Sequence, residues 1–303
     1  MNNNLSPLRI ESISELHNLL HLTKPRHPLL SVVDTCQMKV DESNRKLSFV
    51  MGFYVISYKK STNGKMGYGQ GYYDFDEGGM MFTAPNQIIA TEQNAEYSGF
   101  SIFVHPDFFR NYPLGKNMRK YGFFSYATNE ALHLSEAEQI VILNLFKSID
   151  QELNIPIDET SQDVLISYIE VLLNYSQRFY KRQFMTRKAV NHDLLVRMEE
   201  LLDEYFDNGF SLEKGLPTVE YLADQVNLSP RYLSDMLRSL TGESAQYHIH
   251  EKLLEKAKIY LSTTQLTVAE IAYQLGFEQP QSFNKLFKRK MNLSPLDFRS
   301  NFN

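Results

Sequence analysis

The chain has 303 residues, a length that predicts about two domains, and its 43% apolar content is enough to form packed cores. Its one cysteine, Cys36, excludes an internal disulfide and is expected to be buried as a small apolar side chain. The net charge of −5 argues against indiscriminate polyanion binding, and neither a signal pattern nor a membrane-length apolar run of ~20 residues is present. We therefore expect a soluble protein of the cytoplasm.

Strand signals dominate the N-terminal part of the chain. A short helical pattern over residues 5–23, with Ile13 and Leu16, comes first. Runs rich in β-branched and aromatic residues then occupy 29–34, 46–59, 66–76, 78–90 and 97–104, and Asn63-Gly64 is the clearest hairpin turn. Strands this short and evenly spaced predict a small β-barrel or jelly roll.

Aromatic side chains crowd these strands, and most of them are expected in the core. Tyr54, Tyr68 and Tyr72 are assigned to a small-molecule pocket inside the barrel. We expect no metal, no cofactor and no catalytic residue, because the histidines show no H-x-H strand pattern and no nucleophile motif occurs. His17 and His21 are interpreted as a solvated pair, and His105 as structural.

Two apolar helices are predicted over 135–185. Ser135 with Glu138 has capping-box spacing, Asn154-Ile155-Pro156 breaks the first helix, and Thr160 with Asp163 starts the second. The pair is either a dimer seam, which we favour, or a layer packed on its own barrel. A polar segment, 186–193, is interpreted as the linker to the last domain.

The C-terminal segment 267–292 predicts a helix-turn-helix. Thr267 with Glu270 has capping-box spacing, and Gly276 permits the backbone of a tight turn. The second helix has an apolar face of Phe283, Leu286 and Phe287. Its polar residues, Gln281, Ser282, Asn284, Lys285, Lys288 and Arg289, are expected outward, where a helix can lie in the DNA major groove.

Residues 218–242 repeat this plan about fifty residues earlier. Asn227 takes the place of Gly276, and Ser229-Pro230 begins the second helix. Its expected outward residues are Arg231, Tyr232, Ser234, Asp235 and Arg238. A helix over 244–261, roughly 25 Å long, could hold the two recognition helices near one DNA turn apart.

Residues 194–303 resemble the DNA-binding domain of AraC-type transcription regulators. The resemblance rests on Ala223, Leu228-Ser229, Leu233, Gly242, 254–257, Leu261, 268–272, 275–277, Ser282-Phe283, 286–288, 293–295 and Phe298-Arg299. Asn292 and His248 depart from the usual glycine and aromatic residue. The strands more loosely resemble the cupin-like effector domain of such regulators, through Phe75, Gly79, Pro85-Asn86-Gln87 and His105-Pro106-Asp107.

The resemblance implies an α+β multidomain regulator, not an enzyme. Its parts would be a cupin-like effector domain over 1–134, a dimerisation pair over 135–185, and a DNA-binding domain over 194–303. Expected partners are double-stranded DNA, a small-molecule effector, RNA polymerase and a second copy of the chain. Activation is the working assignment, although the residues do not distinguish it from repression.

Particular roles follow from the same resemblance. Arg231, Ser234 and Asp235 would face base edges in one DNA segment, and Gln281, Ser282, Asn284 and Lys285 in the next. Tyr232 and Arg238 would contact the backbone. The basic cluster of Lys285, Lys288, Arg289 and Lys290 separately predicts contact with phosphates, because of its charge and its place at the end of the helix. Asp235 could instead pair with Arg231 or Arg238. The alternative function is a cupin-type sugar-binding or enzymatic protein with an accessory helical interaction domain.

Overall fold

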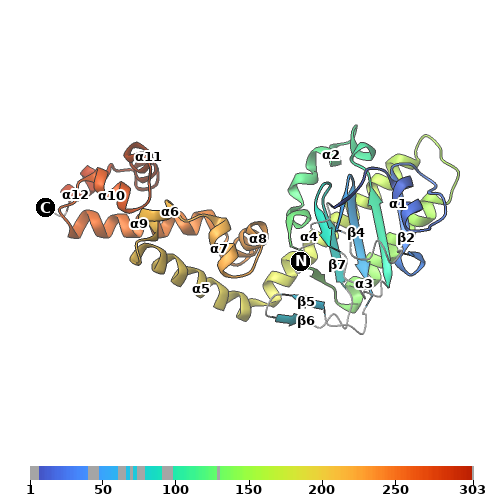
Figure 1. The fold of residues 1–303 in the computed structure, drawn as a ribbon, viewed down its shortest axis with the longest axis horizontal. Coiled ribbons are helices and arrows are strands. Elements are labelled where there is room, and N and C mark those ends of the chain that lie inside the picture. The colour runs from blue at the N-terminus through green and yellow to red at the C-terminus, as the bar shows by residue number, and fades with distance from the viewer. Residues whose placement is uncertain are drawn as a thin grey trace, which may run out of the picture. The chain divides into compact units, whose positions relative to one another are not determined.

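The computed structural model describes residues 7–39, 48–60, 66–68, 71–73, 79–90, 98–127 and 130–301. The chain divides into two compact units, Met1–Gln183 and Phe184–Asn303 (Figure 1). The expected Asn63-Gly64 turn lies outside the described residues. Among the described helices, none is long and apolar enough to cross a membrane.

The N-terminal unit contains a five-stranded antiparallel sheet and smaller sheets. The main sheet has the order β10 (Leu132–His133), β7 (Gly79–Thr83), β4 (Tyr54–Lys59), β9 (Gly99–Val104) and β2 (Leu30–Asp34). A second sheet joins β1 (Leu8–Ile10), β3 (Ser48–Met51) and β8 (Ile88–Ala90), and β5 (Met66–Tyr68) pairs with β6 (Gly71–Tyr73). The predicted strand regions are thus found as strands.

The described strands form open sheets, and no closed barrel is found among them. The three- and five-stranded sheets share one apolar cluster, in which Ile10 and Phe49 meet Val55 and Phe103. The two sheets therefore bury their facing sides together, although the described strands do not close into a barrel. The mixed α and β composition is confirmed, but the cupin-like barrel is not.

Three expectations for the first forty residues are corrected. The helical pattern over 5–23 yields only α1 (Ile13–Leu19), because Leu8–Ile10 pairs with β3 as a parallel strand. His17 is buried, and its ring nitrogens lie 2.6 Å from the Thr23 carbonyl oxygen and 2.9 Å from Ser31 Oγ. Cys36 is exposed in the 3-10 turn Thr35–Gln37, at whose start Asp34 Oδ1 accepts from the Cys36 amide at 2.9 Å.

Short helical turns connect β9 to the helix pair. They are the 3-10 turn Pro106–Phe109, α2 (Pro113–Asn117) and the 3-10 turns Met118–Lys120 and Gly122–Ser125. His105 Nδ1 accepts from the Asp107 amide at 3.2 Å and so caps the first turn, which agrees with its structural interpretation. Phe108, Phe109, Phe123 and Phe124 are buried, so these turns close one side of the unit's core.

The helix pair consists of α3 (Glu136–Leu153) and α4 (Ser161–Thr186). The Ser135–Glu138 capping box is confirmed. Thr160 with Asp163 was predicted to start α4, but Asp158 caps it instead. Asp158 Oδ1 accepts from the amides of Thr160 and Ser161, each at 2.8 Å. Asp163 instead accepts from the Tyr112 hydroxyl.

Most of the apolar surface of α4 is covered within its own unit. Leu165, Ile169, Leu172 and Leu173 are 3% exposed or less. The ring of Tyr180 stacks on Phe123 with centroids 5.6 Å apart, and Ser176 Oγ lies 3.8 Å from Met80 Sδ of β7. The pair therefore packs on its own sheet, the interpretation that the sequence analysis ranked second. Dimerisation stays a prediction.

The C-terminal unit is helical (Figure 1). Its helices are α5 (Lys188–Asp207), α6 (Phe210–Lys214), α7 (Val219–Gln225), α8 (Pro230–Thr241), α9 (Ala245–Thr263), α10 (Val268–Gln274), α11 (Pro280–Met291) and α12 (Pro295–Ser300). α5 begins within the segment 186–193 predicted as the linker. α7 and α8 lie toward one end of α9, and α10 and α12 toward the other (Figure 1).

Candidate nucleic-acid interface

The two helix-turn-helix motifs are built alike. Each pairs a helix of 7 residues, α7 or α10, with one of 12 residues, α8 or α11. The turns use the same hydrogen bond, from the Leu228 amide to the Ala223 carbonyl at 2.9 Å and from Phe277 to Ala272 at 3.0 Å. This six-to-one bond is the helix-ending arrangement that a left-handed residue allows. The predicted repeat is therefore confirmed in its backbone.

Left-handed residues mark the same positions in both motifs. Asn227 has φ 55° and Gly276 has φ 91° in the turns. Gly242 with φ 84° ends α8, and Asn292 with φ 57° ends α11. Asn tolerates this backbone region, so the departure at Asn292 leaves the fold unchanged.

Helix α11 presents an open polar face. Phe283, Leu286 and Phe287 are buried. Six of the predicted contact residues of this helix are exposed, namely Gln281, Ser282, Asn284, Lys285, Lys288 and Arg289. The first four form no side-chain hydrogen bond or ion pair with the rest of the described chain. Lys290, predicted with its neighbours as a phosphate contact, instead turns toward α9, 3.6 Å from Glu251 and 4.5 Å from the Tyr247 ring centre.

Helix α8 presents a face that is already ion-paired. Asp235 accepts from Arg231 Nε at 2.9 Å and from Arg238 Nη1 at 3.0 Å. Ser234 is half-buried on the same side. The interpretation of Tyr232 as an outward residue is wrong, because Tyr232 is 8% exposed and packs edge-on against Phe184 with centroids 5.1 Å apart.

The spacer between the motifs is anchored along its length. Leu253, Leu254, Ala257 and Leu261 of α9 belong to the core that also holds Ile271, Phe283 and Phe287. On its other side, Lys252 and Lys256 form ion pairs with Asp203 of α5 at 2.8 and 3.2 Å. At 19 residues, α9 is about 28 Å long.

Helix α5 packs on the first motif. Met198, Leu201, Leu202 and Tyr205 are buried, and the Tyr205 ring lies edge-on to Tyr221 of α7 with centroids 4.9 Å apart. The Tyr205 hydroxyl donates to the Gly215 carbonyl at 3.0 Å. Burial raises the pKa of this hydroxyl, so it remains a donor at neutral pH.

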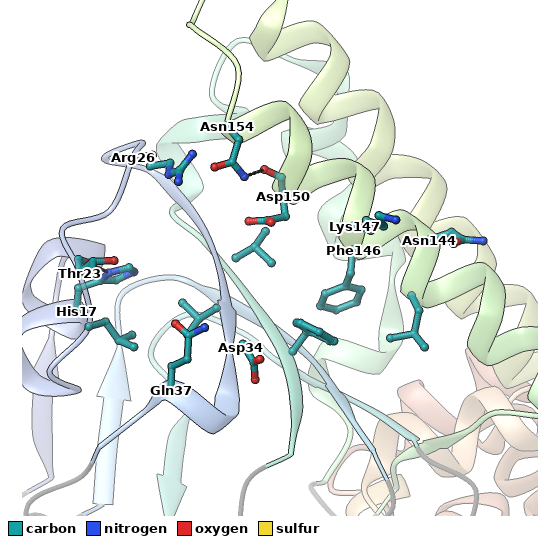
Figure 2. A pocket seen from close by; sticks show the side chains of 15 residues that line it. His17, Thr23, Arg26, Asp34, Gln37, Asn144, Phe146, Lys147, Asp150 and Asn154 are labelled. Carbon is teal, nitrogen blue, oxygen red and sulfur yellow. Dashed lines mark hydrogen bonds between the residues drawn. The ribbon is translucent and has the colours of Figure 1, made fainter.

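The N-terminal unit holds a cavity of about 670 Å³ (Figure 2). It is lined from α1, β2, β9 and α3 by residues including His17, Arg26, Asp34, Phe100, Phe146, Lys147 and Asp150. Charged groups of both signs line the cavity together with the rings of Phe100 and Phe146, whose centroids are 6.4 Å apart. Sequence reasoning missed this cavity, since no local pattern links segments so far apart in the chain.

Of the three predicted pocket tyrosines, Tyr54 is not among the residues that line this cavity. Tyr54 is half-buried elsewhere, with its ring centroid 5.0 Å from that of Phe124. Burial raises its pKa, and the charge of Arg119 opposes that change. Tyr68 and Tyr72 lie on β5 and β6, and their side chains are outside the described residues. In the described part of the chain, no group of three metal-binding side chains occurs.

Comparisons with known proteins concern the C-terminal unit. A family model described as a helix-turn-helix domain matches residues 222–301. The HTH-type transcriptional activator RhaS of Escherichia coli (strain K12 / DH10B) is 38% identical over 78 residues, which are 26% of this chain and 28% of RhaS. The chain thus spans little more than a quarter of the curated relative's length.

Solved structures also resemble this part of the chain. The C-terminal domain of the two-component response regulator yesN from Fusobacterium nucleatum is 33% identical, with 33% of this chain and 95% of that one covered and a TM-score of 0.29. The DNA-binding domain of AdpA, solved with a target DNA, is 25% identical, with coverage of 35% and 91% and a TM-score of 0.30.

The family match covers both recognition helices, α8 and α11, together with the spacer helix between them. Its relatives are transcription regulators rather than enzymes. Residues 222–301 therefore carry a helix-turn-helix domain of the AraC type.

Proposed function

We propose that this chain is a sequence-specific, DNA-binding transcription regulator whose helices α8 and α11 enter adjacent major-groove segments of one duplex. The observation that carries the proposal is the open face of α11. Its side chains Gln281, Ser282, Asn284 and Lys285 are exposed and form no side-chain hydrogen bond or ion pair with other described residues. Side chains of these kinds recognise base edges and phosphates. The relative RhaS is named an activator, and we propose activation for this chain.

Within this proposal, the chemistry of each side chain assigns it either to base edges or to the phosphate backbone. Gln281 and Asn284 can pair with adenine N6 and N7, and Lys285 with guanine O6 and N7. Lys288 and Arg289 lie at the end of α11, where phosphates would pass. On α8, Arg231 and Ser234 would face bases and Arg238 the backbone, whereas buried Tyr232 is withdrawn as a contact.

A gel shift with the full chain tests this function. The duplex is first selected from a randomised pool, and binding is measured at 50, 100 and 200 mM salt against an unselected duplex. We expect steep salt dependence together with preference for the selected site. Equal binding to both duplexes at every salt concentration would exclude a sequence-specific regulator.

We further propose that the N-terminal unit binds a small ligand that controls the regulator, as the sequence analysis suggested. The cavity of about 670 Å³ supports this, because it combines aromatic walls with groups of both charge signs. A ligand can shift the activity only if it binds the two states of the protein with different affinities. Homodimerisation, RNA polymerase contact and a cytoplasmic location belong to the same proposal.

A melting screen against sugars, amino acids and related metabolites tests ligand control. The matched variants are Lys147→Ala, at the cavity, and Lys181→Ala, an exposed lysine of α4 that does not line it. A ligand whose stabilising effect is lost in the first variant and kept in the second would support the cavity as its site. Equal stabilisation of both variants would place the ligand elsewhere.

A further inference from the structure

A carboxylate lies between two arginines on the outward face of α8. Arg231, Asp235 and Arg238 are four and three residues apart, so they share one stripe of the helix. One oxygen of Asp235 accepts from Arg231 Nε at 2.9 Å and the other from Arg238 Nη1 at 3.0 Å. The side chain of Asp235 is 18% exposed, against 45% and 54% for the arginines. The carboxylate is thus the shielded member of the group.

A carboxylate on a face that approaches DNA reduces affinity, because phosphates carry the same sign of charge. Asp235 could offset this cost by accepting a hydrogen bond from cytosine N4 or by orienting an arginine. Both of its oxygens already accept a guanidinium N–H. The geometry therefore favours the second role.

Building on the proposed DNA-binding function, we propose that Asp235 is a positioning residue that directs Arg231 toward a guanine. Asp235 engages Nε of Arg231, so the two terminal nitrogens of that guanidinium remain for O6 and N7 of the base. Holding the side chain before binding also reduces the rotamer freedom lost on association. Asp235 then sets preference at a base that it does not touch.

The test is selection from a randomised duplex pool with the full-length protein and four variants. Asp235→Asn and Asp235→Ser remove the carboxylate charge. Arg231→Lys keeps the positive charge but removes the guanidinium group, which can donate two hydrogen bonds to one base. Glu199→Gln is the control, because it makes the same charge change as Asp235→Asn at an exposed position of α5. Thermal melting of every variant checks that the fold is retained.

We expect the wild type and the control to enrich guanine at one position of the first DNA segment. Both Asp235 variants and Arg231→Lys should lower that preference at least about fivefold, the lower end for one bidentate pair. Preferences in the segment read by α11 should not change. A purely structural role for Asp235 would instead weaken binding to all sequences alike.

Two results would overturn the inference while leaving the regulator intact. One is an unchanged guanine preference in the Asp235 variants when Arg231→Lys loses it. The other is loss of a cytosine preference in the Asp235 variants alone, which would make Asp235 a base reader. If the wild type enriches no motif, the proposed function itself fails and the inference fails with it.

Discussion

Replacement of Gly276 by alanine should damage the second helix-turn-helix more than the matching change at Gly242. Both glycines have left-handed backbones, with φ 91° and 84°. They differ in surroundings. A Cβ at Gly276 would lie 2.6 Å from the carbonyl carbon and oxygen of Gly215 and 2.9 Å from the Leu216 amide nitrogen, whereas a Cβ at Gly242 meets nothing within 4 Å.

The magnitudes follow from this difference. A left-handed backbone costs an alanine about 1–2 kcal/mol, and both variants incur this cost. At Gly276 the obstacle is backbone rather than a flexible side chain, so the structure must shift, at a further cost of about 1–3 kcal/mol. Gly242→Ala should therefore lose about 1–2 kcal/mol and Gly276→Ala about 2–5 kcal/mol.

Hydrogen exchange followed by mass spectrometry suits this comparison. The chain has two compact units, so a single unfolding midpoint need not report one transition. Peptides from α10 and α11 would report the local stability of the second motif, and peptides from α3 and α4 would serve as the internal reference. We expect protection in α10 and α11 to fall furthest in Gly276→Ala, with the reference unchanged.

The close approach of α10's end to Gly215 is the premise of this prediction. Equal loss of protection in the two variants would mean that backbone conformation alone accounts for both. Unchanged protection in Gly276→Ala would mean that the contact with Gly215 is not formed in solution. In that case the packing of the turn on the segment after α6 would have to be abandoned.

Four further changes test other parts of the C-terminal unit. Lys285→Ala should alter the footprint and lower affinity, and an unchanged footprint and affinity would remove Lys285 from the reader. Lys288→Ala should weaken binding to selected and unselected duplexes alike and reduce the slope of log affinity against log salt by about 0.9, as for one lost phosphate contact; a changed sequence preference would contradict this. Thr267→Ala should cost about 1 kcal/mol of local stability in α10, measured by hydrogen exchange, by removing a helix cap; unchanged protection of α10 would contradict this. Burial, aided by Lys290 and Arg289, lowers the pKa of His250 from 6.5, so the stability that it contributes is present above about pH 6.5 and lost as the pH falls through the folded-state pKa. His250→Gln should therefore flatten the stability profile below pH 6.5, and an unchanged profile would exclude this contribution.

Local signals explain why the helix-turn-helix motifs could be predicted. The Thr267–Glu270 box, the left-handed Asn227 and the Ser229-Pro230 start each depend on residues within one turn of each other, and the structure shows all three. Tyr232 is the exception. Its helix position is outward by spacing, but Phe184, distant in sequence, covers it.

Long-range packing explains what could not be predicted in the N-terminal unit. The strands were located by composition, but their closure depends on pairing between segments tens of residues apart, and β1 pairs with β3 where a helix was expected. His17 was interpreted as solvated because its partners, Thr23 and Ser31, come together only in the fold. The cavity of Figure 2 arises from four separate elements for the same reason.

Helix α5 couples the two motifs, which matters if both are to bind one duplex. Its adjacent residues Tyr205 and Phe206 serve different motifs: Tyr205 packs on Tyr221 of the first, and Phe206 belongs to the core of the second. Asp203, one turn earlier, holds the spacer helix through Lys252 and Lys256. A rotation of either motif about the spacer would therefore break packing on α5. The two recognition helices are thus held by three contacts that do not involve DNA, so binding need not supply the free energy to align them.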